Sequence, residues 1–321
     1  NESANASMSV RTGRECFRAL SMPEAVTLAS GVYRVRASVP SRSKATADMV
    51  QTDEAFWTIF SFHFLSGEAF TKADCDAGLT RAVLDATTAR RLFGTTDAVG
   101  HTVQLDYVDY TVAGVVADVS MLATAAYAQI WVPYTAAGAE AMSWQNDTMG
   151  PMHAIILARS SADFDAIREE TELLRKKYND GLQDVEVFYR GQPDTQLAYL
   201  YRRWYAEPDV PGVMLRYAIV VIILLLVPAV NLSGMTLSRM RRRMAEIGVR
   251  KAFGATGGEL MRQVFFENLV LTLLAGIVGL ALSYVAAFAL NGFLFSNSMN
   301  ASLSGETALR PGMLLSPWAF I

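Results

Sequence analysis

Two long stretches without a charged residue dominate the hydrophobic pattern of this chain. Residues 217–238 form an uncharged run of 22 residues, and residues 268–290 form another of 23. A helix needs about 20 apolar residues to cross the hydrocarbon core of a bilayer, so both runs are long enough to span a membrane. Pro228 and Asn231 lie in the first run. Membrane helices tolerate such residues where neighbouring helices satisfy the freed backbone groups, which favours a helix bundle.

The second uncharged run carries small residues at a spacing of four. This spacing places them on one face of a helix, where another helix can approach closely. We therefore predict a helix-packing stripe; the alternative is chance, because alanine and glycine are common in any membrane span. The stripe comprises Ala275, Gly279, Ser283 and Ala287.

The pattern before the first run is that of an ordinary globular region containing strands. Side chains in residues 32–37 alternate with the two-residue period of a strand. Residues 102–105 and 110–116 flank a short polar segment, which predicts a hairpin.

Helices are predicted between these strands. A strand at residues 82–84 precedes a short helix that ends before Gly94, with Thr87 or Thr88 as its N-cap. Apolar residues between Phe164 and Tyr178 recur at spacings of three and four, which is typical of an amphipathic helix.

Strands at residues 154–157 and 185–188 are expected to flank this amphipathic helix. Strands and helices thus mix along the region, which we interpret as one domain or two lobes of the α+β class. The full prediction is a mixed α+β extracytoplasmic domain attached to an α-helical transmembrane bundle.

Charge orients the two predicted spans. The chain is 52% hydrophobic with a mean hydropathy of +0.22, and the two runs account for the excess. Between them, residues 239–262 hold seven basic and two acidic residues, so the positive-inside rule places this loop in the cytoplasm. Residues 1–215, with 19 Lys or Arg against 27 Asp or Glu, then form an acidic region on the other side.

Residues of catalytic type are scattered rather than grouped. No nucleophile elbow, zinc-protease motif or phosphate-binding lysine motif is present, so we expect no enzyme activity, metal or cofactor in this chain and no nucleic-acid partner. Cys16 and Cys75 lie on the extracytoplasmic side, where either free thiols or a disulfide is chemically allowed. The histidines, which we interpret as structural or surface residues, are His63, His101 and His153.

The cytoplasmic loop contains local signals for a sharp corner. A basic helix is predicted over residues 239–253, with Gly254 ending it in a left-handed conformation. Thr256 followed by Glu259 is a capping box that starts the next helix. A phosphate-binding loop over residues 254–258 is the weaker interpretation, because the glycines follow a helix and lack the lysine.

The residues of this loop carry a family resemblance. The sequence EIGVRKAFGAT at residues 246–256, which follows Asn231-Leu232-Ser233 and precedes Gln263 and Glu267, closely resembles the FtsX-like permease signature of MacB-type ABC transporters. Residues 62–70, FHFLSGEAF, resemble a segment of the MacB-like periplasmic core, although Glu68 stands where that family often has a basic residue. Residues 89–94, 99–100 and 110–116 continue that pattern in order.

The resemblance implies a permease subunit of four spans in the inner (cytoplasmic) membrane, with a large periplasmic domain of two lobes between the first and second spans. It implies five segments here: a MacB-like periplasmic core at 1–212, the second span at 213–238, a coupling loop at 239–262, the third span at 263–292, and an extracytoplasmic loop with the start of a last span at 293–321. Because the chain begins without a Met or a signal segment, we expect a preceding helix.

The resemblance also implies partners. These are an ABC-type ATPase that supplies the ATP and Mg²⁺ chemistry, a second permease copy in a homodimer or related heterodimer, and the lipid bilayer. A periplasmic adaptor, an outer-membrane duct or an envelope hydrolase would complete the assembly. ATP hydrolysis would be transmitted through the membrane as a mechanical stroke that drives export or extraction.

We assign the docking of the ATPase to the coupling loop, with charged residues pairing and Ile247 as the apolar anchor. The alternative for this basic loop is contact with lipid headgroups, worth about 1 kcal/mol per charge near an anionic surface, which we prefer for Arg241, Arg242 and Arg243. The residues assigned to coupling are Glu246, Ile247, Gly248, Arg250, Lys251, Gly254 and Ala255, and the cap at membrane entry is Thr256 with Glu259.

Two other functions stay open from the sequence. An FtsX-like relay would move its outer domain to activate a cell-envelope hydrolase rather than export a substrate. A membrane sensor would have no ATPase at all. The cargo is not readable from the residues, since one fold hosts many functions.

Overall fold

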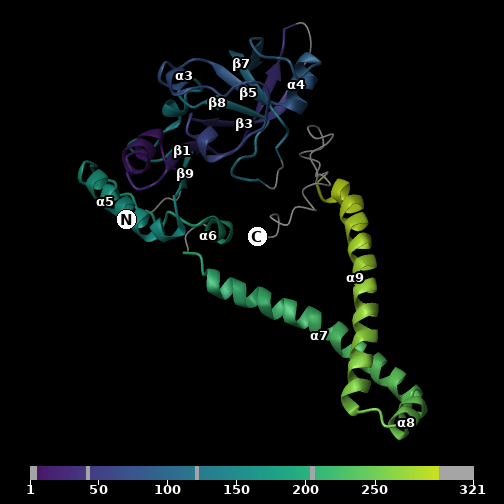
Figure 1. The fold of residues 1–321 in the computed structure, drawn as a ribbon. Helices are drawn as coiled ribbons and strands as arrows, with labels where there is room; N and C mark the ends of the chain where they lie inside the picture. The colour runs from purple at the N-terminus through teal and green to yellow at the C-terminus, as the bar shows by residue number, and fades with distance from the viewer. Residues whose placement is uncertain (1–5, 41–43, 120–122, 203–206, 296–321) are drawn as a thin grey trace. The chain divides into compact units, whose positions relative to one another are not determined.

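The computed structural model describes residues 6–40, 44–119, 123–202 and 207–295, with side chains up to Ala286 and at Ala289. The chain divides into two compact units (Figure 1). The outer unit runs to Pro193, and the membrane unit runs from Asp194 to Leu290. Each unit is considered separately below.

The outer unit alternates strands and short helices. Its strands are β1 (Ala25–Ser30), β2 (Tyr33–Ser38), β3 (Lys44–Thr52), β4 (Phe64–Gly67), β5 (Arg81–Asp85), β6 (Thr102–Leu105), β7 (Val108–Val116), β8 (Ile130–Pro133) and β9 (Met152–Leu157). Its helices are α1 (Val10–Gly13), α2 (Phe56–Ile59), α3 (Lys72–Asp76), α4 (Ala86–Phe93) and α5 (Phe164–Asp180), with a π-helical turn at Arg14–Arg18 and 3₁₀ turns at Ala139–Met142 and Ser161–Asp163. The mixed α+β class is confirmed.

The main sheet of the outer unit is mixed and closes on itself. Its seven strands follow the order β4-β7-β5-β8-β3-β2-β6, and β6 also pairs with β7. Its parallel pairs are β5 with β7 and β3 with β8, and the other pairs, such as β2 with β3, are antiparallel. Strands β1 and β9 form a separate antiparallel pair. Closure leaves β4 as the strand outside the ring.

The closed sheet encloses an aliphatic core. Alternate residues of β5 and β6, such as Leu84 and Val103, are fully buried there together with Leu92 of α4. A second cluster is aromatic: Trp131 and Phe56 are fully buried, and the Trp57 ring lies 6.0 Å from that of Trp131. Large aromatic side chains contribute much of the buried apolar area in such a core.

The predicted hairpin is confirmed, with a tighter turn than expected. Leu105 pairs with Val108, so β7 begins two residues earlier than the predicted Tyr110. The turn consists of Asp106 and Tyr107, both at positive φ, as a two-residue turn of the I′ type requires.

Two predictions in the outer unit are wrong. The N-cap of α4 is Asp85, whose carboxylate accepts the Thr88 N–H at 2.7 Å, rather than Thr87 or Thr88. Residues 185–188 form no strand. Instead the Asn179 side chain exchanges two hydrogen bonds with the backbone of Val187, both of 3.0 Å, which ties this segment to α5 rather than to a sheet.

The membrane unit is helical. It comprises α6 (Gln196–Tyr201), α7 (Val210–Arg242), α8 (Met244–Ala252) and α9 (Gly257–Phe295). By length and composition, α7 and residues Gly257–Ala286 of α9 could each cross a membrane. The predicted single helix over residues 239–253 is wrong: α7 continues to Arg242, and a non-helical Arg243 separates it from α8.

Candidate functional site

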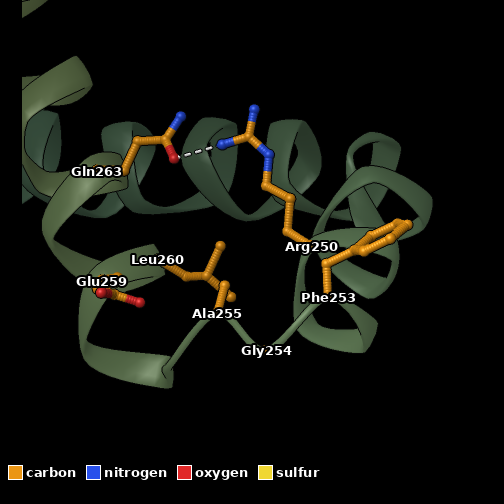
Figure 2. Close-up of a pocket in the computed structure, with 7 residues that line it drawn as sticks. All are labelled: Arg250, Phe253, Gly254, Ala255, Glu259, Leu260 and Gln263. Atoms are coloured by element: carbon orange, nitrogen blue, oxygen red, sulfur yellow. Dashed lines mark hydrogen bonds between the residues drawn. The ribbon is translucent and has the colours of Figure 1, made fainter.

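The candidate site is the elbow, defined as Arg243, α8, residues 253–256 and the first turns of α9 as far as Glu267. Figure 2 shows its corner, where the chain leaves α8 and enters α9. The predicted coupling residues all lie in this stretch. Its shape follows from a helix stop and a helix start that are adjacent in the sequence.

The stop is a helix end of the Schellman type. Gly254 has a φ of +91°, a left-handed conformation that glycine adopts without the cost of a Cβ. Its N–H donates to the Lys251 carbonyl and the Ala255 N–H donates to the Arg250 carbonyl, both at 3.1 Å. These two bonds satisfy carbonyls at the end of α8. The role of Gly254 is therefore conformational.

The start of α9 is a reciprocal cap. The Thr256 N–H donates to Glu259 Oε2 at 2.9 Å, and the Glu259 N–H donates to Thr256 Oγ1 at 3.4 Å. Two N–H groups near the helix start are thereby satisfied. The cap therefore fixes the residue at which α9 begins.

A chain of polar bonds joins α8 to α9. Arg250 donates to Glu246 at 2.8 Å within α8 and to Gln263 at 2.6 Å on α9 (Figure 2). Gln263 donates to Glu267 at 3.4 Å, and Arg243 donates to the other oxygen of Glu267 at 2.7 Å. The acidic and basic members are exposed, so each pair contributes about 0.2–1 kcal/mol.

Sequence reasoning missed three members of this chain. In the sequence, Gln263 and Glu267 stand out only as part of the motif, and Arg243 stands out only as one of the basic residues expected at lipid headgroups. Arg243 breaks the helix between α7 and α8 and reaches α9, although it lies 24 residues before Glu267. The available signal was the presence of a basic residue, Arg243, before the predicted corner and an acidic residue, Glu267, after it.

Exposed apolar side chains lie along α8 and at its end. Phe253 is 89% exposed, and Figure 2 shows its ring pointing away from Ala255 and Leu260. Met244 and Val249 are also exposed, whereas Ile247, the anchor expected from the sequence, is half-buried. Phe253 is thus the most exposed large apolar side chain of the elbow. A shallow hollow of about 450 Å³ lies beside it, lined by Arg250, Phe253, Gly254, Ala255, Glu259, Leu260 and Gln263.

The remaining predicted residues are exposed. Lys251 and Gly248 lie on α8, and a Cβ added at Gly248 would meet nothing within 4 Å. On α9, Ala275, Gly279 and Ser283 are exposed, and a Cβ at Gly279 would also meet open space. The side chain of Ala287 lies outside the described residues, as do residues 296–321. Nothing within the described chain packs against this stripe.

The cysteines and His153 of the outer unit lie in structural surroundings. Cys16 and Cys75 are free, and each is buried in a different hydrophobic cluster. His153 is bonded to Ser7, and burial lowers its pKa. Among the described residues no group of three His, Cys, Asp or Glu side chains could hold a metal ion. The two cysteines thus contribute to hydrophobic packing, and His153 contributes a hydrogen bond.

Buried Asp85 is the most perturbed carboxyl group of the outer unit. Burial raises its pKa to about 7, against the opposing effect of the hydrogen bonds from Thr88. The Thr87 N–H donates to Asp118 at 2.8 Å, so two carboxyl groups sit at the start of α4. The arrangement is that of a doubly capped helix end.

Two family profiles cover most of the chain. The MacB-like periplasmic core domain matches residues 2–174, and the FtsX-like permease C-terminal domain matches residues 218–321. The elbow falls within the second match.

Curated relatives match across both regions. The pyoverdine export ATP-binding/permease protein PvdT of Pseudomonas aeruginosa is 28% identical over 231 residues, or 71% of this chain and 33% of that protein. The macrolide export ATP-binding/permease protein MacB of Escherichia coli K12 is 27% identical over 255 residues, or 78% and 36%. The chain therefore spans about a third of the length of these relatives.

Solved structures resemble part of the chain. The periplasmic region of MacB from Actinobacillus actinomycetemcomitans has a TM-score of 0.44 and 18% identity, covering 54% of this chain and 75% of that one. The extracellular domain of the ABC-type transporter YknZ has a TM-score of 0.42 and 18% identity, covering 54% and 84%.

Proposed function

Because the chain belongs to the family that joins a MacB-like periplasmic core domain to an FtsX-like permease domain, we propose that it is the membrane subunit of an ATP-driven transporter of the inner membrane. In this proposal the elbow is the surface against which a cytoplasmic ABC-type ATPase pushes. The outer unit moves in response, so that a substrate is exported or extracted on the periplasmic side. The ATP and Mg²⁺ chemistry belongs to the ATPase.

The observation that carries the proposal is the combination of a locally fixed corner with an exposed apolar group. Gly254 and Thr256 fix where α8 ends and α9 begins. The exposed Phe253 side chain projects from the end of α8. An exposed aromatic residue beside charged ones is typical of an anchor that fills a pocket on a partner. Topology alone requires basic residues in this loop, but no aromatic residue at the corner.

Force on the elbow would pass to the membrane helices through two kinds of connection. The backbone of the corner connects α8 to α9 directly, and Arg250 bonds α8 to Gln263. Arg243 connects the end of α7 to Glu267 on α9. A push on α8 would therefore reach both membrane helices rather than one. This is the arrangement that a mechanical coupling element needs.

The roles assigned to Glu246 and Arg250 are refined by these contacts. Both are engaged within the elbow, so we propose that they hold its shape. Lys251 and Phe253 then remain as the charged and apolar groups offered to the ATPase. Arg241 and Arg242, at the end of α7, stay assigned to lipid headgroups.

The docking role is tested by co-purification of the ATPase with Phe253→Ala and with a matched control. Leu173→Ala is the control, because Leu173 is exposed on α5 in the outer unit. We expect Phe253→Ala to weaken ATPase binding about tenfold or more, as loss of an interface anchor does. Leu173→Ala should leave binding unchanged.

The outcomes separate the alternatives. Unchanged ATPase binding by Phe253→Ala would overturn the docking role. Failure of any ATP-binding subunit to co-purify with the unsubstituted protein would favour a sensor. Binding of the outer unit to an envelope hydrolase, rather than to an adaptor or an outer-membrane duct, would favour an FtsX-like relay.

A second copy of the permease is also proposed as a partner, at the small-residue stripe of α9. The exposed Gly279 would allow a neighbouring helix to approach closely. Gly279→Cys should form a disulfide-linked dimer in the membrane if two copies meet there. Ile277→Cys, an exposed position on the opposite side of the same helix, is the control that should cross-link less.

A further inference from the structure

Helix α6 ends at the level where α7 becomes uncharged. The ring of Tyr201, the last residue of α6, lies 6.1 Å from the ring of Tyr217 on α7. Tyr217 is the first residue of the uncharged run of 22, and Arg216 precedes it. At about 1.5 Å per residue this run is roughly 33 Å long, close to the hydrocarbon thickness of a bilayer. Tyr217 therefore marks the outer boundary of the membrane, and α6 lies beside that boundary.

The surface of α6 is apolar and uncovered. Its six residues, Gln196–Tyr201, carry no charge. Leu197, Tyr199 and Leu200 are 45%, 57% and 61% exposed, so half of the helix presents large apolar or aromatic groups. A soluble surface rarely concentrates three such groups in one turn and a half.

The charges that flank α6 are paired with each other. Arg202 donates to both carboxylate oxygens of Asp194, with Nη2 at 2.7 Å from Oδ1. The exposed fractions of these side chains are only 12% and 7%. Thr195 caps the helix start by accepting the Ala198 N–H at 3.2 Å. The helix is thus held between an N-cap and an ion pair, in which the charges of Asp194 and Arg202 offset each other.

We propose that α6 is an interfacial helix that lies in the outer leaflet of the bilayer, with Leu197, Tyr199 and Leu200 inserted between lipid headgroups. Tyrosine side chains are enriched at this depth because one end is apolar and the other polar, and Tyr199, Tyr201 and Tyr217 gather there. The partner is a lipid surface rather than a protein. Insertion of α6 in the bilayer requires no ATPase.

The function of such a helix would be to fix the depth of α7. A helix inserted about 5–10 Å into the headgroup region resists both sinking and rising of the span to which it is packed. The contact between Tyr201 and Tyr217 supplies the connection. Movement transmitted along α7 would then become rotation or tilt rather than sliding along the membrane normal.

The test measures the depth of a fluorophore on α6 in the 321-residue chain reconstituted in nanodiscs. The label is attached at Leu200→Cys, with Leu173→Cys on the outer unit and Leu224→Cys in the span as controls; all three positions are exposed on helices. Cys16 and Cys75 are buried and do not compete for the label. Lipids brominated near the headgroup or deep in the acyl chain serve as quenchers, and iodide serves as the aqueous quencher.

We expect shallow bromines to quench the Leu200 label by about half and deep bromines to quench it less. The Leu224 label should show the reverse order, and iodide alone should quench the Leu173 label. Iodide quenching without bromolipid quenching at Leu200 would overturn the proposal, because α6 would then lie in water. Protection from both quenchers would also overturn it, because protein would then cover the helix.

A second variant tests the cause of insertion. With Leu197→Asp and Leu200→Asp together, a label at Tyr199→Cys should lose at least half of its shallow bromolipid quenching. The two leucines are 45% and 61% exposed, so their replacement removes no fully buried side chain. Unchanged quenching at Tyr199 would show that the leucines do not insert.

Discussion

The outer unit and the elbow of the membrane unit use different interactions to hold their shapes. In the outer unit, Trp131, Phe56 and Leu84 are completely buried inside or beside a closed sheet. By contrast, α8 lies wholly within the described residues and has no buried residue. The elbow is held by caps and by exposed ion pairs such as Arg243 with Glu267. Full burial contributes about 1.5–3 kcal/mol per large apolar side chain, whereas an exposed pair contributes less than about 1 kcal/mol.

This difference suggests a division of mechanical roles. A close-packed core transmits motion as a rigid body and resists deformation. An elbow held by exposed polar bonds can change its helix-to-helix angle at small cost, provided that its corner keeps its backbone conformation. The predictions below test the two halves of this comparison, beginning with the largest expected effect.

Trp131→Ala should destabilise the outer unit by about 3–5 kcal/mol, because it removes a fully buried ring from the aromatic cluster. The measurement is the midpoint of urea unfolding, followed by the fluorescence of the remaining tryptophans. Leu173→Ala on the surface of α5 is the control, with an expected change within about 0.5 kcal/mol. Similar effects for both variants would contradict a core organised around Trp131.

The outer unit should lose stability as the pH rises from about 4 to about 7. The pKa of buried Asp85 is raised to about 7 in the folded state and is near 3.9 in the unfolded chain, so the folded state binds the extra proton between these values. The stabilisation is complete below the unfolded value and disappears above the folded one. A difference of about three pKa units between the folded and unfolded states corresponds to a loss of up to about 4 kcal/mol in the free energy of unfolding.

Asp85→Asn tests the origin of this dependence. Asparagine can still accept the Thr88 N–H as an N-cap but carries no charge. Hydrogen exchange of residues 81–94, corrected for the intrinsic rate, should therefore become less dependent on pH in the variant. An unchanged dependence would assign it to other groups. The exposed pairs of the elbow serve as the internal comparison, for which little change is expected.

Gly254→Ala should destabilise the elbow by about 1–2 kcal/mol, because Ala must adopt a φ of +91°. Gly258→Ala is the matched control: Gly258 lies in the first turn of α9, where an added Cβ meets nothing within 4 Å. That variant should be neutral or slightly stabilising. Hydrogen exchange of residues 250–258 distinguishes them, and equal exchange would contradict a left-handed corner.

The smallest effect is expected at the pair between Arg243 and Glu267. A double-mutant cycle with Arg243→Ala and Glu267→Ala should give a coupling energy of about 0.2–1 kcal/mol that falls with added salt. Hydrogen exchange of α8 at low and high salt provides the readout. A coupling above 2 kcal/mol would mean that this pair is buried in the membrane, and the contrast with the outer unit would then fail.

The sequence was most informative where hydrogen bonds are short in range. The corner at Gly254 and the reciprocal pair of Thr256 and Glu259 follow from residues three to five positions apart. The two long helices follow from hydropathy alone. By contrast, the ring closure of the main sheet joins Ala37 to Leu105, a pairing that periodicity cannot indicate.

The errors have identifiable physical reasons. Residues 185–188 have the composition of a strand, but Asn179 satisfies their backbone from the side, which only the folded chain shows. The break at Arg243 carries no glycine or proline signal. Thr87 and Thr88, the expected caps, lie inside α4, whose N-cap is Asp85, the last residue of β5. Asn179 and Asp85 each bond to backbone beyond their own element, whereas the Arg243 side chain reaches the Glu267 carboxylate on α9.

The corner between α8 and α9 has a consequence for how the protein is made. Its hydrogen bonds join Lys251 to Gly254, Arg250 to Ala255 and Thr256 to Glu259, so little loop-closure entropy opposes it. Local turns of this kind form within microseconds, far faster than a ribosome adds residues. We therefore expect the reversal of direction to be complete before the last residues of α9 are synthesised. The insertion machinery would then receive the second apolar helix already pointing back toward the bilayer.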